Sequence, residues 1–225
     1  GARSVSWSEG VTFVRSRKKV YGAYLFGAPF IVITLYALQA WVPTLLIRVH
    51  GMDIADAGRG YGSIALLCGS AGVLCGPVFA QYLTGKGHND SGLKVAMLAA
   101  AALLPAIVFA GFTADTTLAL VAIAVSSFFV TVPMALFTTG LQAVTPNEMR
   151  GVIAGIYVVV VNLFGLALGP TSVALVTDYV FADAGAVGAS MAIVCAVSLP
   201  VAMLMFYFGL GEGSSSDSEG RVVGH

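Results

Sequence analysis

The sequence predicts an all-α, polytopic membrane protein in which six transmembrane helices form two triplets related as a 3+3 inverted repeat. The first observation is composition: 58% of the 225 residues are hydrophobic, 10% are charged, and the mean hydropathy is +0.91. Soluble domains carry about 25% charged residues. The second observation is that the charges fall in short segments. The third is that polar side chains within the uncharged stretches follow a three-helix pattern.

Six uncharged stretches define the helices in order along the chain. Each is at least 20 residues long, and a bilayer core about 30 Å thick needs about 20 helical residues to cross it. Prolines, glycines and loop residues trim the ends of these stretches. The predicted helices are Tyr21–Ile47, Gly60–Thr84, Val95–Phe112, Leu118–Val144, Gly151–Thr177 and Val187–Gly209.

The segments outside the helices assign the chain a three-part organisation. Residues 1–19 are predicted to be a cytoplasmic lead-in with a short interfacial helix, because Ser6 and Glu9 have capping-box spacing. Its basic cluster is interpreted as a topology anchor rather than a site for a specific lipid. Residues 20–210 are predicted to form a six-helix transmembrane domain. The Gly/Ser-rich and acidic residues 211–225 are predicted to be a disordered cytoplasmic tail.

Lysine and arginine are distributed unequally between the two sides of the predicted bundle. Nine of them lie in the two terminal segments, in 85–94 and in 145–150, whereas the other loops carry only Arg48 and Arg59. Cytoplasmic loops of membrane proteins are the basic ones. We therefore expect a multi-pass protein of the cell membrane, plasma or bacterial inner, with both termini in the cytoplasm.

The first and fourth helices carry the polar side chains and prolines that suit an aqueous cavity. Pro29 and Pro43 are predicted to kink the first helix, and Pro133 lies in the middle of the fourth. A proline frees a backbone carbonyl, which neighbours or water must satisfy. The alternative for each Ser or Thr is a hydrogen bond to its own helix. Thr145 and Glu148 have capping-box spacing, which predicts a short turn into the fifth helix.

The second and fifth helices carry GxxxG pairs, which let helix backbones approach closely. We expect these small residues to form tight packing seams along a moving interface. The pairs are Gly58 and Gly62, Gly72 and Gly76, Gly151 and Gly155, and Gly165 and Gly169, the last followed by Pro170. The third and sixth helices are the most apolar, so each triplet ends in a lipid-like helix.

The distribution of charge also excludes several functions. The net charge is zero, so no overall field attracts nucleic acid. No ionisable side chain lies in the middle of a predicted span, and His50, His88 and His225 lie in loops or the tail. No metal cluster, cofactor or catalytic group is therefore expected, and the chain is not expected to be an enzyme. If the complete machine is ion-coupled, its main titrating residue is expected elsewhere.

Several motifs resemble one family of membrane proteins. The stretch Gln142–Gly151 resembles the loop between the tenth and eleventh helices of major facilitator superfamily transporters. The stretch Asn162–Pro170, followed by Asp178, resembles the eleventh helix. The stretch Gln39–Arg48, followed by Ala55–Gly58, resembles the seventh helix and its loop in the spinster-type and organic-anion branches.

The resemblance covers about residues 5–210 and corresponds to the C-terminal half of a twelve-helix fold. The sequence departs from the family at Gln81 and Tyr82, where Asp and Arg are common. In the family this loop can form ionic contacts that hold the outward-facing state, and this half lacks those two charges. The resemblance implies that the first and fourth helices line a central cavity, that the second and fifth face the other half, and that the third and sixth pack outside. The implied partners are the lipid bilayer, an N-terminal six-helix half in the same or a separate chain, and a small-molecule substrate.

The function that the resemblance implies is secondary transport of a small organic solute by alternating access. The alternatives are a non-transporting truncated or regulatory membrane subunit and a homodimeric half-transporter; the absence of an initial Met favours a domain of a longer chain. The loop motif is represented by Arg150 and Gly151. The expected cavity or substrate contacts are Tyr36, Gln39, Trp41, Thr138, Gln142, Tyr157 and Asn162.

Overall fold

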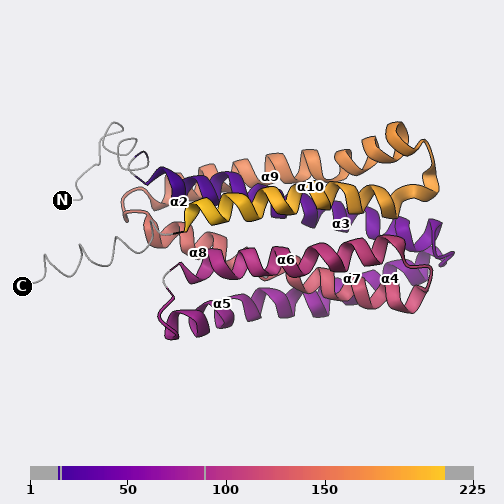
Figure 1. The fold of residues 1–225 in the computed structure, drawn as a ribbon, viewed down its shortest axis with the longest axis horizontal. Coiled ribbons are helices and arrows are strands. Elements are labelled where there is room, and N and C mark those ends of the chain that lie inside the picture. The colour runs from indigo at the N-terminus through magenta and orange to yellow at the C-terminus, as the bar shows by residue number, and fades with distance from the viewer. Residues whose placement is uncertain (1–14, 16, 89, 211–225) are drawn as a thin grey trace, which may run out of the picture.

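Six long helical stretches, each antiparallel to the next along the chain, form most of the described structure (Figure 1). This computed structural model describes residues 15, 17–88 and 90–210, so the predicted interfacial helix and tail lie outside the described residues. Each stretch is long and apolar enough to cross a membrane, which confirms the six predicted helices. The described residues contain no strand.

Several of the six spans are assembled from more than one helical segment. Span one consists of α2 (Lys18–Gly22), the π-helical turn η1 (Ala23–Gly27) and α3 (Ala28–Arg48). Span two consists of α4 (Ile54–Ile64), η2 (Ala65–Gly69) and α5 (Ser70–Gly85), and span three is α6 (Ser91–Phe112). Span four consists of α7 (Thr116–Thr131) and α8 (Met134–Val144), span five of α9 (Arg150–Leu175) and η3 (Val176–Phe181), and span six of η4 (Ala184–Ala186) and α10 (Val187–Gly209).

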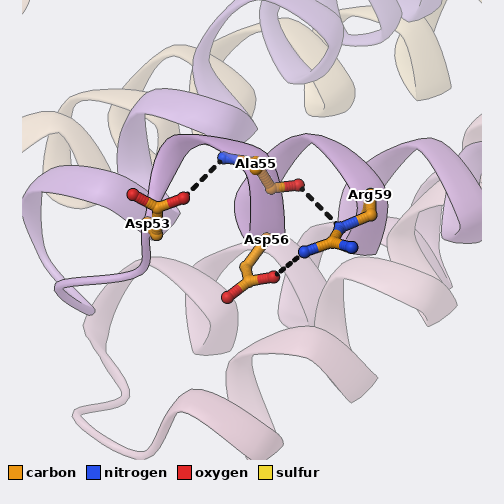
Figure 2. A network of polar contacts seen from close by, with 4 residues as sticks. All are labelled: Asp53, Ala55, Asp56 and Arg59. Carbon is orange, nitrogen blue, oxygen red and sulfur yellow. Dashed lines mark hydrogen bonds and ion pairs between the residues drawn. The ribbon is translucent and has the colours of Figure 1, made fainter.

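Spans two and five extend beyond their predicted ends because charged residues near a membrane surface can remain helical. Span two begins at Ile54, where the Asp53 side chain accepts a hydrogen bond from the Ala55 amide at 3.1 Å, as an N-cap does (Figure 2). One turn later Arg59 pairs with Asp56 at 2.6 Å. This pair is exposed, so it contributes little stability. Span five likewise continues past Asp178 to Phe181.

The fourth predicted helix is interrupted in its middle. Residues 132 and 133 form a turn between α7 and α8, where a kinked but continuous helix was expected. Pro133 has no amide hydrogen to donate to the carbonyl of Phe129 four residues earlier, so the helical ladder stops after the Val132 amide, which donates to the Phe128 carbonyl at 3.2 Å. By contrast, Pro43 lies inside α3 without interrupting it, and Pro29 falls at the start of that helix.

The packing of the spans has the two-triplet pattern. Span three packs most extensively on span six, span one packs on span five, and span four packs on span two. When spans one, two and three are exchanged for spans four, five and six, the contact of spans one and five becomes that of spans four and two. The contact of spans three and six becomes itself, as an inverted repeat requires. Spans two and five are the least covered: 17% and 22% of their most apolar windows are buried, against 39–50% in the other four.

Candidate substrate-facing surface

The middle of the α3–α9 contact holds a hydrogen bond between two of the predicted site residues. The Tyr36 hydroxyl donates to the Asn162 Oδ1 atom at 2.9 Å, and Asn162 Nδ2 donates to the Val158 carbonyl at 2.8 Å. Both residues lie in the middle third of their spans. Asn162 is exposed and Tyr36 is half-buried. One Nδ2 hydrogen of this oriented amide remains available for a solute, because an Asn amide has two.

Small residues bring α9 close to α3 beside this pair. A Cβ atom added to Gly165 would lie 2.6 Å from Val32 Cγ1, and one added to Gly169 would lie 2.7 Å from the Ile33 carbonyl oxygen. One turn further along α3, the Trp41 indole donates to the Pro170 carbonyl at 2.9 Å. Trp41 is thus fixed at the seam between spans one and five.

An equivalent seam, also between the two triplets, joins spans four and two. A Cβ atom added to Gly72 would overlap Thr131 Oγ1 and the Phe128 carbonyl oxygen, and one added to Gly76 would overlap the Val132 carbonyl oxygen. Thr131 lies 2.9 Å from the carbonyl oxygen of Gly69, at the end of the π-helical turn η2. These glycines pack within the six-helix unit. By contrast, Gly58, Gly62, Gly151 and Gly155 have no described neighbour at the Cβ position.

Three of the predicted contacts are exposed polar side chains without a described hydrogen bond. Gln39 lies on α3, and Thr138 and Gln142 lie one turn apart on α8. Within the described residues no side-chain hydrogen bond is formed by any of the three. An exposed amide or hydroxyl in a membrane-spanning segment needs a partner, which water, a solute or another polypeptide can supply.

Tyr157 is placed differently from these exposed residues. It is 7% exposed and belongs to the main hydrophobic core. Tyr157 therefore packs behind the surface that carries Asn162, one and a half turns along the same helix. The sequence could not separate the two, because both are polar residues on α9.

The end of α8 is fastened by residues whose role the sequence reasoning missed. The Tyr21 hydroxyl lies 3.0 Å from Thr145 Oγ1, which in turn donates to the Leu141 carbonyl at 2.6 Å. The Thr145 hydroxyl therefore donates back to α8, and among the described residues no capping bond joins it to the turn that follows. The reason is that the last carbonyls of a helix lack amide partners and attract a nearby hydroxyl. The predicted turn is present, with the Met149 amide donating to the Pro146 carbonyl at 3.0 Å.

Arg150, a residue of the predicted loop motif, also caps α8. Its Nε atom lies 2.9 Å from the Gln142 carbonyl oxygen and 3.1 Å from that of Thr145. A cation at a helix C-terminus is favourable electrostatically. Gly151, which follows it, has no described neighbour at its Cβ position. Arg150 therefore fixes the end of the helix that carries Thr138 and Gln142.

A polar hollow of about 590 Å³ opens beside α8, and no sequence pattern pointed to it. Gln81 and Thr84 of α5, Ser91 of α6 and Thr139 of α8 are among its lining residues, and Tyr24 of η1 closes one side. These residues come from four spans, so only the tertiary structure brings them together.

The described spans present neutral polar groups rather than charges to this surface. Every charged residue of the described spans lies within two turns of a span end. Amide, hydroxyl and indole groups bind the hydroxyl and carboxyl oxygens of a solute by hydrogen bonds. Neutralising a charged solute requires a group beyond this surface.

Comparison with known proteins places these features in a family context. The sequence profile of the Major Facilitator Superfamily matches residues 2–170. The probable galactarate/D-glucarate transporter GarP of Escherichia coli K12 is 28% identical over 198 residues, which cover 88% of this chain and 43% of GarP. The probable galactarate/D-glucarate transporter GudP of Bacillus subtilis strain 168 is 28% identical over 67% of this chain and 32% of GudP.

An MFS-type efflux pump of Mycolicibacterium smegmatis is 27% identical over 76% of this chain and 39% of the pump. The fold is similar to that of a bacterial homologue of the human lysosomal transporter Spinster in an inward-facing, unoccupied conformation, with a TM-score of 0.61 and 16% identity over 93% of this chain and 49% of that one. The chain thus matches between about a third and a half of the length of each of these relatives.

Proposed function

Because the chain belongs to the Major Facilitator Superfamily, we propose that it is the C-terminal half of a secondary transporter that moves a small organic solute by alternating access. It is a multi-pass membrane protein. In this proposal an N-terminal six-helix half packs against the sparsely covered spans two and five, and the two halves rock around a site near the bilayer midplane. The alternating motion would expose that site to each side of the membrane in turn.

The observation that carries the proposed site is the bond between Tyr36 and Asn162. It joins two spans near their middles and holds an exposed amide in one orientation. Transporter sites lie near the midplane between repeats. Gln39 on α3 and the pair Thr138 and Gln142 on α8 supply further unoccupied polar groups. We assign Trp41 and Tyr157 to shaping the walls, because one is fixed at a seam and the other lies in the core.

We propose a hydroxylated organic acid as the solute class. Two relatives are named as probable transporters of galactarate and D-glucarate, and the neutral amides and hydroxyls of this half suit the hydroxyl groups of such a molecule. The counter-charge for its carboxylates would come from the N-terminal half, since the middles of the described spans carry no cation.

Transport measurements on single-residue variants test the site. In proteoliposomes that contain the full-length transporter, Asn162→Ala and Gln39→Ala are expected to reduce uptake of radiolabelled D-glucarate at least about tenfold, the typical effect of about 1.4 kcal/mol lost from the transition state. Asn147→Ala removes an exposed amide outside the spans and serves as the matched control, with uptake unchanged.

The outcomes of this assay distinguish a wrong assignment of the site residues from a wrong solute class. Equal uptake by wild type and both variants would contradict the site. In another outcome, the wild type fails to take up D-glucarate but transports another organic solute, and the two variants lose that transport. This result would contradict the proposed solute class but support the proposed site residues. No transport of any organic solute by a folded full-length protein would favour the non-transporting alternative.

A further inference from the structure

An apolar groove lies on the outer surface between α5 and α6, on a different face of α5 from the polar hollow. Its volume is about 190 Å³, and all its lining side chains are apolar or aromatic. Phe79 and Tyr82 form the α5 wall, Val95 and Leu98 form the α6 wall, and Phe129 and Val132 lie at the junction of α7 and α8. Figure 1 shows α5 and α6 side by side, joined at the end of the bundle where α2 begins.

Two lysines stand at the end of this groove, each one turn from a wall residue. Lys86 follows Tyr82 by four residues, and its Nζ lies 4.3 Å from the centroid of the Tyr82 ring. Lys94 precedes Leu98 by four residues on α6, so both lie on one face of that helix. Leu98 is 60% exposed and Tyr82 is 61% exposed. The exposed groove wall on α5, at Tyr82, and that on α6, at Leu98, are therefore each followed by a lysine at the end of the bundle where α5 ends and α6 begins.

The groups around the lysines leave the site positive. Lys94 Nζ donates to His88 Nδ1 at 3.3 Å, which draws the loop histidine toward the α6 lysine. Asp90, the acidic residue of this loop, lies one turn before Lys94 and lines the polar hollow, so the two lysines outnumber the acidic groups of the loop by one. Near the groove mouth the structure thus places two lysines, both partly or fully exposed.

We propose that this groove binds an anionic membrane phospholipid, with one acyl chain between α5 and α6 and the phosphate between Lys86 and Lys94. The groove supplies an apolar wall but no hydrogen-bonding group, which suits a hydrocarbon chain. The lysines supply the positive charge that an anionic headgroup requires, and lysine stems at helix ends reach the headgroup level. If the two lysines served only to orient the chain in the membrane, they would not need to lie one turn from exposed residues of the groove wall. The site is independent of the proposed solute and lies on the outer surface of the six-helix unit.

Lipid binding to the full-length transporter can be measured by native mass spectrometry after mixing with phosphatidylglycerol or phosphatidylcholine of identical acyl chains. The wild type is expected to prefer phosphatidylglycerol. Because each basic residue near an anionic lipid contributes about 1 kcal/mol, Lys86→Gln and Lys94→Gln should each weaken phosphatidylglycerol binding about fivefold and the double variant about 25-fold. Lys18→Gln removes an exposed lysine at the same end of the bundle, away from the groove, and should leave binding unchanged.

A second variant tests the groove without altering charge. Leu98→Trp fills it with a larger apolar side chain at a position already exposed, and phosphatidylglycerol binding should fall while thermal stability is retained. Glycerol 3-phosphate, which has the headgroup charge but no acyl chain, should not displace the bound lipid. Retention of the wild-type lipid preference by the double lysine variant, or unchanged binding by Leu98→Trp, would overturn the proposal.

Discussion

Hydrogen bonds to a span other than their own are formed by the side chains of Tyr36, Trp41 and Thr131. Their partners are Asn162, the Pro170 carbonyl and the Gly69 carbonyl, at 2.9 Å in all three cases. Hydrogen bonds between membrane helices contribute about 0.6 kcal/mol on average. At that strength each bond orients its groups more than it stabilises the fold, which matters most where an amide is exposed to a solute.

The role of Tyr36 in orienting Asn162 leads to a transport prediction. Tyr36→Phe removes the hydroxyl donor and frees the Asn162 amide to rotate. We expect the apparent KM for the solute to rise about threefold to tenfold, equivalent to roughly 0.6–1.4 kcal/mol of binding. The measurement is the concentration dependence of uptake into proteoliposomes.

Tyr179→Phe provides the matched control for this substitution. Tyr179 is 81% exposed near the end of span five and forms no described hydrogen bond. Its variant should transport with the wild-type KM. A Tyr36→Phe protein with an unchanged KM would show that the amide needs no tyrosine to hold it.

At the level of elements, the glycine seams determine how closely neighbouring spans approach. Gly76 faces the Val132 carbonyl oxygen and Gly169 faces that of Ile33, so in each triplet a glycine meets backbone rather than a side chain. A backbone atom cannot move aside by changing rotamer. Residue size at these positions therefore sets the separation of spans four and two and of spans one and five.

Substitution of these glycines by alanine should produce opposite effects at packed and open positions. Gly76→Ala forces the helices apart and is expected to lower stability by about 1–3 kcal/mol. Gly62→Ala lies in the same span but has no neighbour within 4 Å, so it should leave stability unchanged or raise it by up to about 1 kcal/mol. Thermal unfolding of the two detergent-solubilised variants measures this difference. Equal melting temperatures would show that span two does not pack tightly on span four.

At the scale of the whole molecule, an even number of spans places both described chain ends at one end of the bundle (Figure 1). The turns after α5 and α8 lie at that end, and those after α3 and α9 lie at the other. We propose that the first end is cytoplasmic, because it carries the excess of lysine and arginine.

Cysteine labelling tests this orientation in intact cells. In a background without Cys68, Cys75 and Cys195, a membrane-impermeant maleimide should label Asp53→Cys and Asp183→Cys directly. It should label His88→Cys only after the membrane is permeabilised. The three parent residues are exposed, so access to the reagent depends on the side of the membrane. The reverse labelling pattern would invert the proposed topology.

The sequence alone determined the number of spans, their approximate ends and the triplet pattern. Hydropathy and charge are local quantities, and the bilayer thickness fixes how long an apolar helix must be. Even so, local charge placed the start of span two and the end of span five too far inward, since Asp56, Arg59 and Asp178 remain helical at the surface. The break at Pro133 was expected only as a kink.

The tertiary structure decided which polar groups meet. Tyr36 and Asn162 are 126 residues apart in sequence, and Tyr21 and Thr145 are 124 apart. Both pairings depend on how each helix is rotated about its axis, and packing against the neighbouring spans fixes that rotation. The same rotation buries Tyr157 while exposing Asn162 on one helix, and it places Tyr82, with Lys86 over its ring, and Leu98 on the walls of one groove. A local pattern does not specify these rotations, because lipid and protein interior are similarly apolar.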